Sequence, residues 1–234
     1  MPEDRKVRIL DAGAGEGYFA ALLHQAGYTD IRACDYVEEG YCFPKVPFTQ
    51  ADLARELPFE DNSFDCVVSI EVIEHIPDHL TFMQELVRVT RPGGLLFITT
   101  PNLMSLSSRW HFFLYGYTDC APLPLDPHRK DWFMQHTNPI GVPRLLFHLE
   151  RNGAELIGLL TNRSRRGSRL FAPVLGPLFR WLTRRRLLAK KYKERHSLHE
   201  RHLKWVLSSA NLLGRITIAQ ARKGGPPMEL KSEC

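Results

Sequence analysis

The stretch Asp11-Ala12-Gly13-Ala14-Gly15-Glu16-Gly17 decides how the first half of this 234-residue chain folds. A short apolar run at residues 7–10 precedes it and predicts a strand. Apolar residues then recur at helical spacing over residues 19–26, and Gly27 ends the predicted helix. Glycines between a strand and a helix let the backbone approach a ligand closely, beside free N–H groups. The Gly-x-Gly-x-Gly spacing differs from the dinucleotide-binding pattern, so a plain tight turn remains the alternative at this point.

Strand-like and helix-like patterns continue to alternate after this turn. Four strand-like runs follow, at residues 31–34, 47–50, 64–70 and 95–99. Asp78 stands where it can cap a helix that reaches about Val89, before the breaker Arg91-Pro92-Gly93-Gly94. Two more strands are expected at residues 154–160 and 215–221. Alternation of this kind predicts a parallel sheet with helices on both faces.

Two carboxylates follow the next expected strands and favour a nucleoside ligand. Asp35 ends the second strand, 24 residues after Asp11, where a carboxylate can accept hydrogen bonds from a ribose diol. Its neighbour Tyr36 can pack on a base, and Asp52, after the third strand, can accept a hydrogen bond from an exocyclic amine. These positions favour a ligand site over a merely structural turn.

Residues 7–102 resemble the class I S-adenosylmethionine (SAM)-dependent methyltransferases. The motifs that carry the resemblance occur in the family's order: DAGAGEG, ACDY, LPFEDNSFDCVVS, EVIEHIPD and RPGGLLFITTPN. The resemblance implies an α/β fold with a single Rossmann-like, seven-stranded, mostly parallel sheet. In that family the last strand is antiparallel and is inserted beside the sixth. We therefore expect one domain over residues 1–222 and a disordered tail at residues 223–234.

The same resemblance implies SAM as the cofactor and assigns a role to each matching position. The glycines of the turn are expected around the methionine moiety, which Asp11 orients. Asp35 is expected on the ribose, with Asp52 and the Leu53 amide facing adenine. The full set expected to bind the cofactor is Asp11, Gly13, Gly15, Gly17, Asp35, Tyr36, Asp52, Leu53 and Glu71.

A Glu-x-x-Glu-His pattern follows the fourth expected strand. Glu71, Glu74 and His75 would share one face on a turn of helix. The pattern resembles the O-methyltransferases of ubiquinone biosynthesis and the small-RNA terminal 2′-O-methyltransferases. In the RNA branch a further histidine completes a metal site, and here His136 lies 61 residues after His75. We expect Glu71, Glu74, His75 and His136 to hold Mg²⁺ or Mn²⁺, with His75 and His136 as the catalytic pair. A metal-free general base and a purely structural cluster are the alternatives.

Residues 103–140 are where this family usually builds the acceptor pocket. They are rich in aromatic residues, which suggest a planar or amphiphilic acceptor: Trp110, Phe112, Phe113, Tyr115, Tyr117, Trp132 and Phe133. A small core under a long loop is the alternative. Arg109, His128, Arg129 and Lys130 can meet an anionic group of the acceptor.

The charge of the chain is unevenly distributed. The net charge of +5 comes from 31 basic and 26 acidic residues, but residues 163–204 alone contain 14 Lys and Arg against two acids. This leaves 17 basic and 24 acidic residues in the rest of the chain, which we call the acidic body. The basic amphipathic insertion is expected at residues 163–205, between the last two strands. Its apolar islands favour an anionic membrane surface as partner. Nucleic acid is less favoured, and a solvated helical insertion is the third possibility.

The sequence also predicts a compartment and an activity. Residues 1–10 lack the apolar core of a secretory signal, and the five cysteines form no Cys-x-x-Cys pair. The longest apolar run, residues 170–179, is far shorter than the roughly 20 residues of a spanning helix. We expect a cytoplasmic enzyme, peripheral at the membrane, that methylates a hydroxyl of a lipid-like, quinone-like or lipid-linked glycan acceptor. RNA 2′-O-methylation and a SAM-binding module without turnover are the alternatives, and the oligomeric state is left open.

Overall fold

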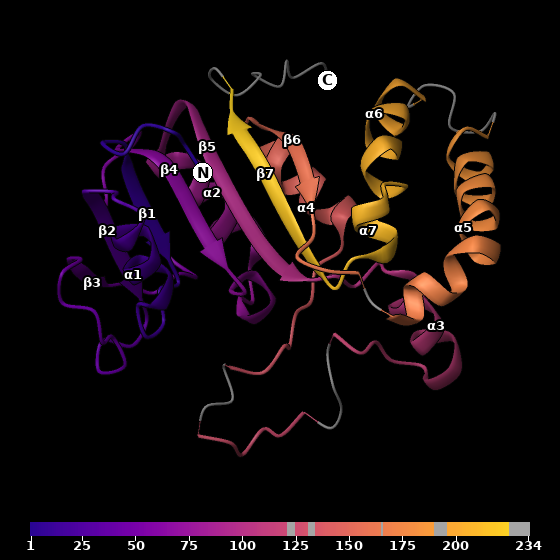
Figure 1. Cartoon of the computed structure of the whole chain (residues 1–234), viewed down its shortest axis with the longest axis horizontal. Helices are drawn as coiled ribbons and strands as arrows, with labels where there is room; N and C mark the ends of the chain where they lie inside the picture. The colour runs from indigo at the N-terminus through magenta and orange to yellow at the C-terminus, as the bar shows by residue number, and fades with distance from the viewer. Residues whose placement is uncertain (121–124, 131–133, 165, 190–195, 225–234) are drawn as a thin grey trace, which may run out of the picture.

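A seven-stranded sheet runs through the molecule, with its strands drawn as arrows in Figure 1. The strands are β1 (Arg8–Ala12), β2 (Asp30–Asp35), β3 (Phe48–Gln50), β4 (Phe64–Ile70), β5 (Thr90–Pro101), β6 (Ala154–Leu160) and β7 (Ile216–Lys223). Their order across the sheet is β3-β2-β1-β4-β5-β7-β6. β1 to β5 pair in parallel, and β7 pairs antiparallel with both β5 and β6. This arrangement confirms the fold class expected from the sequence.

The computed structural model describes residues 1–120, 125–130, 134–164, 166–189 and 196–224. Its helices are α1 (Tyr18–Gln25), η1 (Ile73–His75, a 3₁₀ turn), α2 (His79–Val89), α3 (Leu106–Tyr115), α4 (Val142–Arg151), α5 (Arg166–Leu187), α6 (His196–Val206) and α7 (Ser209–Leu213). Asp78 caps α2 by accepting hydrogen bonds from the Leu80 and Thr81 amides, as its position predicted. The strand after α2 begins at Thr90, five residues earlier than expected, so the Arg91–Gly94 breaker lies inside β5.

Two apolar cores cover the two faces of the sheet. Along β1 the side chains alternate, because successive residues of a strand point to opposite faces. Ile9 is buried in one core with Ala20 of α1, while Leu10 is buried in the other. That second core includes Leu86 of α2 and Leu145 of α4. Helices therefore lie on both faces, and the sheet's carboxyl edge is left for loops.

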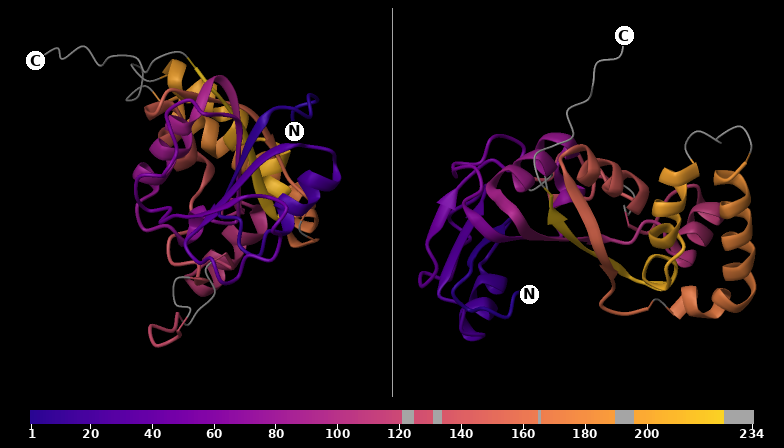
Figure 2. Two further views of the ribbon diagram at one scale, coloured as in Figure 1. Left: turned by 90° about the vertical axis from the view of Figure 1, so that its left-hand side faces the viewer. Right: turned by 90° about the horizontal axis from the view of Figure 1, so that it is seen from above.

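The basic insertion lies between β6 and β7, as the sequence predicted, and it folds mainly into α5 and α6. Figure 2 shows α5 at the outer edge of the molecule, at the end opposite to β3. Within the described residues, no helix is both long enough and apolar enough to cross a membrane.

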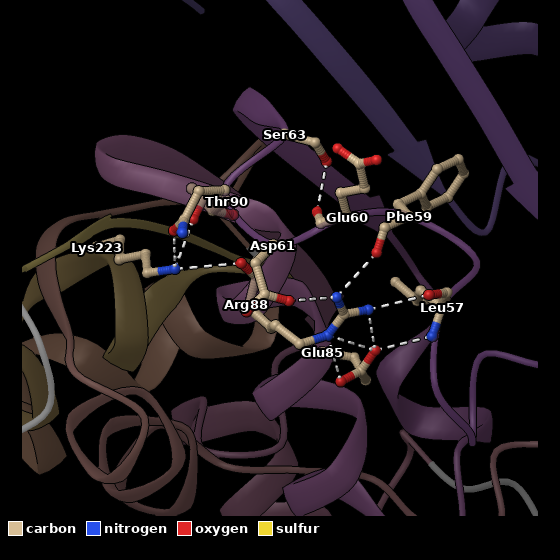
Figure 3. A network of polar contacts seen from close by, with 10 residues as sticks. Leu57, Phe59, Glu60, Asp61, Ser63, Glu85, Arg88, Thr90 and Lys223 are labelled. Carbon is tan, nitrogen blue, oxygen red and sulfur yellow. Dashed lines mark hydrogen bonds and ion pairs between the residues drawn. The ribbon is translucent and has the colours of Figure 1, made fainter.

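A single arginine of α2 anchors the loop that leads into β4 (Figure 3). The Arg88 guanidinium donates hydrogen bonds to the carbonyl oxygens of Leu57 and Phe59, at 2.9 and 2.8 Å. It also pairs with Asp61 at 2.7 Å and with Glu85 at 2.7 Å. The LPFEDNSFD stretch is therefore held in place by α2.

The end of β7 lies further along the chain than expected. Lys223 was expected to begin a disordered tail, but it is the last residue of β7. Its ammonium group donates to the Thr90 carbonyl oxygen at 2.7 Å and to Asn62 Oδ1 at 2.8 Å. Residues 225–234 lie outside the described residues, so disorder there stays a prediction.

Candidate functional site

The turns after β1 and β4 meet where the strand order reverses, which is where α/β sheets bind ligands. Gly13, Gly15 and Gly17 all have positive φ angles, of 90°, 51° and 82°. A Cβ on Gly13 would lie 2.2 Å from Cγ2 of Val72, which follows β4, so only glycine allows the two turns to approach this closely. A Cβ on Gly15 would meet nothing within 4 Å, so the turn faces open space there.

Asp35 closes this crevice from the end of β2. Its Oδ2 accepts a hydrogen bond from the Gly15 amide at 2.7 Å, and its Oδ1 accepts one from the Tyr36 amide at 2.6 Å. The carboxylate therefore lies against the glycine turn, and each oxygen retains a second lone pair for a ligand hydroxyl. The Tyr36 side chain is exposed beside it.

Asp11 lies under the turn, with 1% of its surface exposed. Its Oδ2 has no hydrogen-bond partner among the described residues. Burial raises the pKa of Asp11 from 3.8 to about 7, and the nearby charge of Asp35 adds to this rise. A cationic ligand in the crevice would oppose this rise in the pKa of Asp11, because a nearby positive charge favours the ionised carboxylate.

The expected adenine contacts lie beside the crevice and are partly engaged by the protein. Asp52 Oδ2 pairs with Arg55 Nε at 3.1 Å, and its Oδ1 accepts a hydrogen bond from the Ala54 amide. The Leu53 side chain is buried in the core that includes α2. Their roles toward a base stay predictions.

Glu71 has a different environment from the one the sequence suggested. It has a positive φ of 55°, a conformation that is uncommon for a residue with a side chain and is often found at functional sites. Its Oε1 accepts a hydrogen bond from the Thr99 hydroxyl at 2.9 Å, and burial raises its pKa. Because the chain turns sharply here and then forms η1, Glu71 does not share a helical face with Glu74 and His75.

Glu74, His75 and His136 come together as a cluster whose ligand-capable atoms all lie within 4.8 Å of one another. Glu71 is outside this group. His136 Nε2 lies 3.9 Å from Glu74 Oε1, and the two histidine rings are 4.9 Å apart between centroids. The loop containing His136 is thus folded back onto η1 across 60 residues of chain, as the sequence hypothesis required.

Glu74 is completely buried, and neither of its carboxylate oxygens has a hydrogen-bond partner among the described residues. Burial raises its pKa from 4.5 to about 7, and the charge of Glu71 adds to the rise. The nearby Thr100 hydroxyl lowers the pKa of Glu74, although the two groups form no hydrogen bond of good geometry. A buried carboxylate without partners is costly, so this one is suited to a cation or a donated proton.

Backbone carbonyls orient both histidines. His75 Nδ1 lies 3.1 Å from the Gln135 carbonyl oxygen, and His136 Nδ1 lies 2.7 Å from that of Cys120. A carbonyl oxygen only accepts, so Nδ1 of each ring is the donor, and in the neutral form of each ring the lone pair is on Nε2. Metal-binding histidines are commonly held this way, and so are histidines that act as bases.

Sequence reasoning missed the residues that hold this cluster together. The Asn138 side chain donates hydrogen bonds to the carbonyl oxygens of Ile76 and Pro77, both at 3.0 Å. The backbone N–H of Asn138 donates to the carbonyl oxygen of Glu74. Ser108 of α3 donates to Asp119 next to Cys120. The Thr-Asn-Pro that follows His136 was the available signal, since asparagine commonly orders loops through backbone contacts.

The expected acceptor region, residues 103–140, is only partly described. Trp132 and Phe133 lie outside the described residues. On α3, Phe112, Phe113 and Tyr115 are exposed, so these rings do not form the small core that was the alternative. A depression of about 450 Å³ lies next to His136 and is lined by Leu125, Asp126, Pro127, Gln135 and Thr137.

Comparison with known proteins agrees with this geometry. Residues 10–98 match the family described as "Methyltransferase domain". A Mycobacterium tuberculosis protein named a probable S-adenosylmethionine-dependent methyltransferase is 42% identical over 104 residues, which cover 42% of this chain and 37% of that protein. Phthiotriol/phenolphthiotriol dimycocerosates methyltransferase 1 of Mycobacterium ulcerans is 34% identical over 120 residues, covering 47% of this chain and 43% of that protein. The matched part therefore spans less than half the length of either relative.

The fold itself is shared over a longer stretch. A crystal structure of a SAM-dependent methyltransferase from Archaeoglobus fulgidus superposes with a TM-score of 0.58, covering 93% of this chain and 86% of that chain. The sequence identity of that pair is 19%, so the similarity concerns the fold alone.

Proposed function

We propose that this chain, whose core is a methyltransferase domain of the class I fold, transfers the methyl group of SAM to a hydroxyl of an acceptor molecule. The observation that carries the proposal is the acidic crevice at the reversal of strand order. Asp35 faces the open side of the glycine turn, and Asp11 has a buried carboxylate oxygen without a partner. A ligand with ribose hydroxyls and positive charge suits both groups, and SAM has both features.

SAM would supply a methyl group made electrophilic by its sulfonium. The glycine turn and Asp11 would bind the methionine part, and Asp35 would bind the ribose hydroxyls. The chain must then hold the acceptor oxygen about 3 Å from the methyl carbon and in line with the bond that breaks. His75 and His136 present Nε2 lone pairs, either of which can accept the acceptor's proton.

A divalent ion held by Glu74, His75 and His136 is the first of two roles we propose for the cluster. One carboxylate and two imidazoles suit Mn²⁺ better than Mg²⁺, because Mg²⁺ prefers ligands that are all oxygen. Such an ion would lower the pKa of the acceptor hydroxyl. The other role is a metal-free general base, which the same Nδ1-anchored histidines support. With Glu71 outside the group, Mn²⁺ becomes the favoured ion.

For the acceptor we propose a lipid-like, quinone-like or lipid-linked glycan molecule. The M. ulcerans relative is named for a triol derivative, which supports a hydroxyl acceptor. Exposed aromatic rings on α3, next to the segment that leads to His136, support an amphiphilic one.

Incubation of the whole chain with radiolabelled SAM and fractionated cell extract tests the proposal. Label is expected in a lipid, quinone or lipid-linked glycan fraction, and it should be lost in the Asp35→Asn variant. Label in RNA would replace this acceptor class with RNA 2′-O-methylation. Binding of SAM without label in any fraction would contradict methyl transfer and support a module without turnover.

A further inference from the structure

One face of α5 is apolar and exposed. Leu170, Val174, Leu178 and Trp181 recur at intervals of four, four and three residues, which is the spacing of one helix face, and Pro173 and Pro177 lie within this stretch. Their exposed fractions are 74%, 75%, 46% and 55%. Figures 1 and 2 place α5 as the outermost helix of the molecule, and the exposed fractions show that the described chain leaves these side chains open to solvent.

The neighbouring helix α3 also has exposed aromatic residues. Phe112, Phe113 and Tyr115 are exposed by 56%, 76% and 61%. The two helices are held together where the Ser107 amide donates to the Ser168 hydroxyl at 3.0 Å. The Arg109 guanidinium also lies over the Phe179 ring at 5.3 Å. These contacts hold α3 on the side of α5 away from the apolar stripe, so α3 fixes the position of α5.

Arginines border the apolar face. α5 contains six arginines, all exposed, and no acidic residue: Arg166, Arg169, Arg180, Arg184, Arg185 and Arg186. By the helical period, Arg166 and Arg184 lie beside the apolar stripe, and Arg185 lies over the Trp181 ring at 5.2 Å. Arg180 instead donates a hydrogen bond to the Leu207 carbonyl oxygen at 3.5 Å. Apolar side chains edged by arginines are typical of helices that lie in the interface of an anionic bilayer.

From these observations we propose that the exposed apolar face of α5 docks the protein on an anionic lipid bilayer. A second copy of the chain fits less well, because pairing two such faces would bring six arginines against six. A nucleic acid would need the arginines but would gain nothing from the leucine, valine and tryptophan stripe. The bilayer is the occupant that satisfies both the charge and the apolar surface.

The docking surface is connected to the candidate active site through α3. The Ser108 hydroxyl of α3 donates to Asp119 at 2.7 Å, and the Cys120 carbonyl next to it orients His136. α3 also begins just after β5, at the carboxyl edge of the sheet where the crevice lies. Docking would thus place the acceptor side of the site near the lipid. This last step rests on the proposed function, whereas binding to the bilayer does not.

Co-sedimentation of the whole chain with vesicles tests the docking surface without any cofactor. We expect binding to vesicles of phosphatidylcholine mixed with phosphatidylglycerol, weak binding to phosphatidylcholine alone, and release by salt. The variant Arg184→Glu/Arg185→Glu/Arg186→Glu should bind at least about tenfold more weakly, since each basic residue near such a surface contributes about 1 kcal/mol. The variant Leu170→Gln/Val174→Gln should also bind more weakly, and it separates the apolar contribution from the charge.

The control makes the same charge change at the other end of the molecule. Lys6, Arg32 and Lys45 are exposed around β1 to β3, and Lys6→Glu/Arg32→Glu/Lys45→Glu should bind vesicles nearly as wild type does. Three outcomes would overturn the docking surface. The control variant could lose as much vesicle binding as the α5 variant, or binding could be independent of lipid charge and salt. The third outcome is salt-sensitive binding to RNA that is tighter than binding to vesicles. SAM binding, measured on the same samples by calorimetry, tests the proposed function separately. Absence of vesicle binding with SAM binding intact overturns only the docking surface.

Discussion

At the scale of single residues, Asp35 is the clearest test of the cofactor site. Asp35→Asn keeps the size of the side chain and removes its charge. A hydrogen bond to a charged group contributes about 1.5–3 kcal/mol, so the Kd for SAM should rise about tenfold to a hundredfold. Isothermal titration calorimetry measures this change directly.

Asp30→Asn is the matched control for that prediction. Asp30 lies at the opposite end of the same strand, where it forms an exposed ion pair with Arg8 at 3.2 Å. Its replacement should leave the affinity for SAM unchanged. An Asp35→Asn protein that binds SAM as tightly as the Asp30→Asn protein would place the ribose elsewhere.

His136 tests the proposed cation at the same scale. His136→Ala removes one of three ligands, so the affinity for Mn²⁺ should fall at least about tenfold. Mn²⁺ paramagnetic resonance reports binding without any acceptor. His128→Ala is the control, because His128 is exposed on the same segment of chain and is outside the cluster.

The same measurements decide between the two roles of the cluster. Mn²⁺ should bind wild-type protein more tightly than Mg²⁺ does, given the two imidazoles. If neither ion binds, or if methyl transfer is equally fast in EDTA, the metal role is excluded, which leaves a metal-free base or a purely structural cluster.

At the scale of secondary-structure elements, Arg88 ties α2 to the loop before β4. Arg88→Met should lower the free energy of unfolding by about 2–3 kcal/mol, because it removes the cation that pairs with the largely buried Glu85 and the donor to two carbonyl oxygens. Urea denaturation measures the loss. Arg91→Met is the control, and its exposed pair with Asp65 should contribute less than about 1 kcal/mol.

The contribution of Arg88 to the free energy of unfolding should also depend on pH. Burial acts to raise the pKa of Glu85, but hydrogen bonds from Arg88 and the Leu57 amide outweigh it, so the pKa lies below 4.5. The ionised pair therefore stabilises the protein above pH 4.5, and its contribution is lost as pH falls through the lowered pKa. A difference between wild type and Arg88→Met that does not shrink in acid would contradict this account.

The helices and strands also show why sequence patterns predicted the fold. The α2 cap at Asp78 and the glycine turn depend on neighbouring residues, so short stretches of sequence were enough to predict them. The Glu71–His75 segment shows the limit. Helical spacing predicted one shared face, but Glu71 hydrogen-bonds to Thr99 on β5 and adopts a positive φ. That contact joins residues far apart in the chain, which periodicity does not detect.

At the scale of the whole molecule, buried carboxylates should make stability depend on pH. The pKa of Asp11 is about 7 in the folded protein and 3.8 when it is exposed, so the folded state holds a proton that the unfolded state has lost between these values. The free energy of unfolding of the cofactor-free protein should therefore fall as pH rises from about 4 to 7. Glu74, with a pKa raised to about 7, acts in the same direction.

Urea unfolding across this pH range checks the prediction. Asp11→Asn should make the dependence shallower, whereas the exposed Asp30→Asn should not. SAM affinity should in turn increase as pH rises through about 7, because a cationic ligand favours ionised Asp11. An identical pH dependence in wild type and Asp11→Asn would show that Asp11 does not hold the proton.

The acidic body and the basic insertion differ in charge and in the role that we propose for each. The body is acidic and contains the crevice proposed for a cationic cofactor. The insertion between β6 and β7 contains the excess of basic residues, and it folds into helices at the edge of the molecule. The net charge of +5 therefore describes neither part.

Local pattern and the family resemblance together predicted the seven strands, though not the bounds of β5 and β7, and they also predicted the glycine turn, Asp35 at the end of β2 and the position of the basic insertion. These features depend on hydrophobic period, turn chemistry and order along the chain, all of which can be read within short windows. Tertiary structure decided which acidic residue joins the two histidines, because the loop containing Asn138 must fold back onto η1 to bring Glu74 and His136 together. It also decided which side of α5 remains uncovered. Both outcomes depend on contacts between distant segments, whose geometry no local pattern specifies.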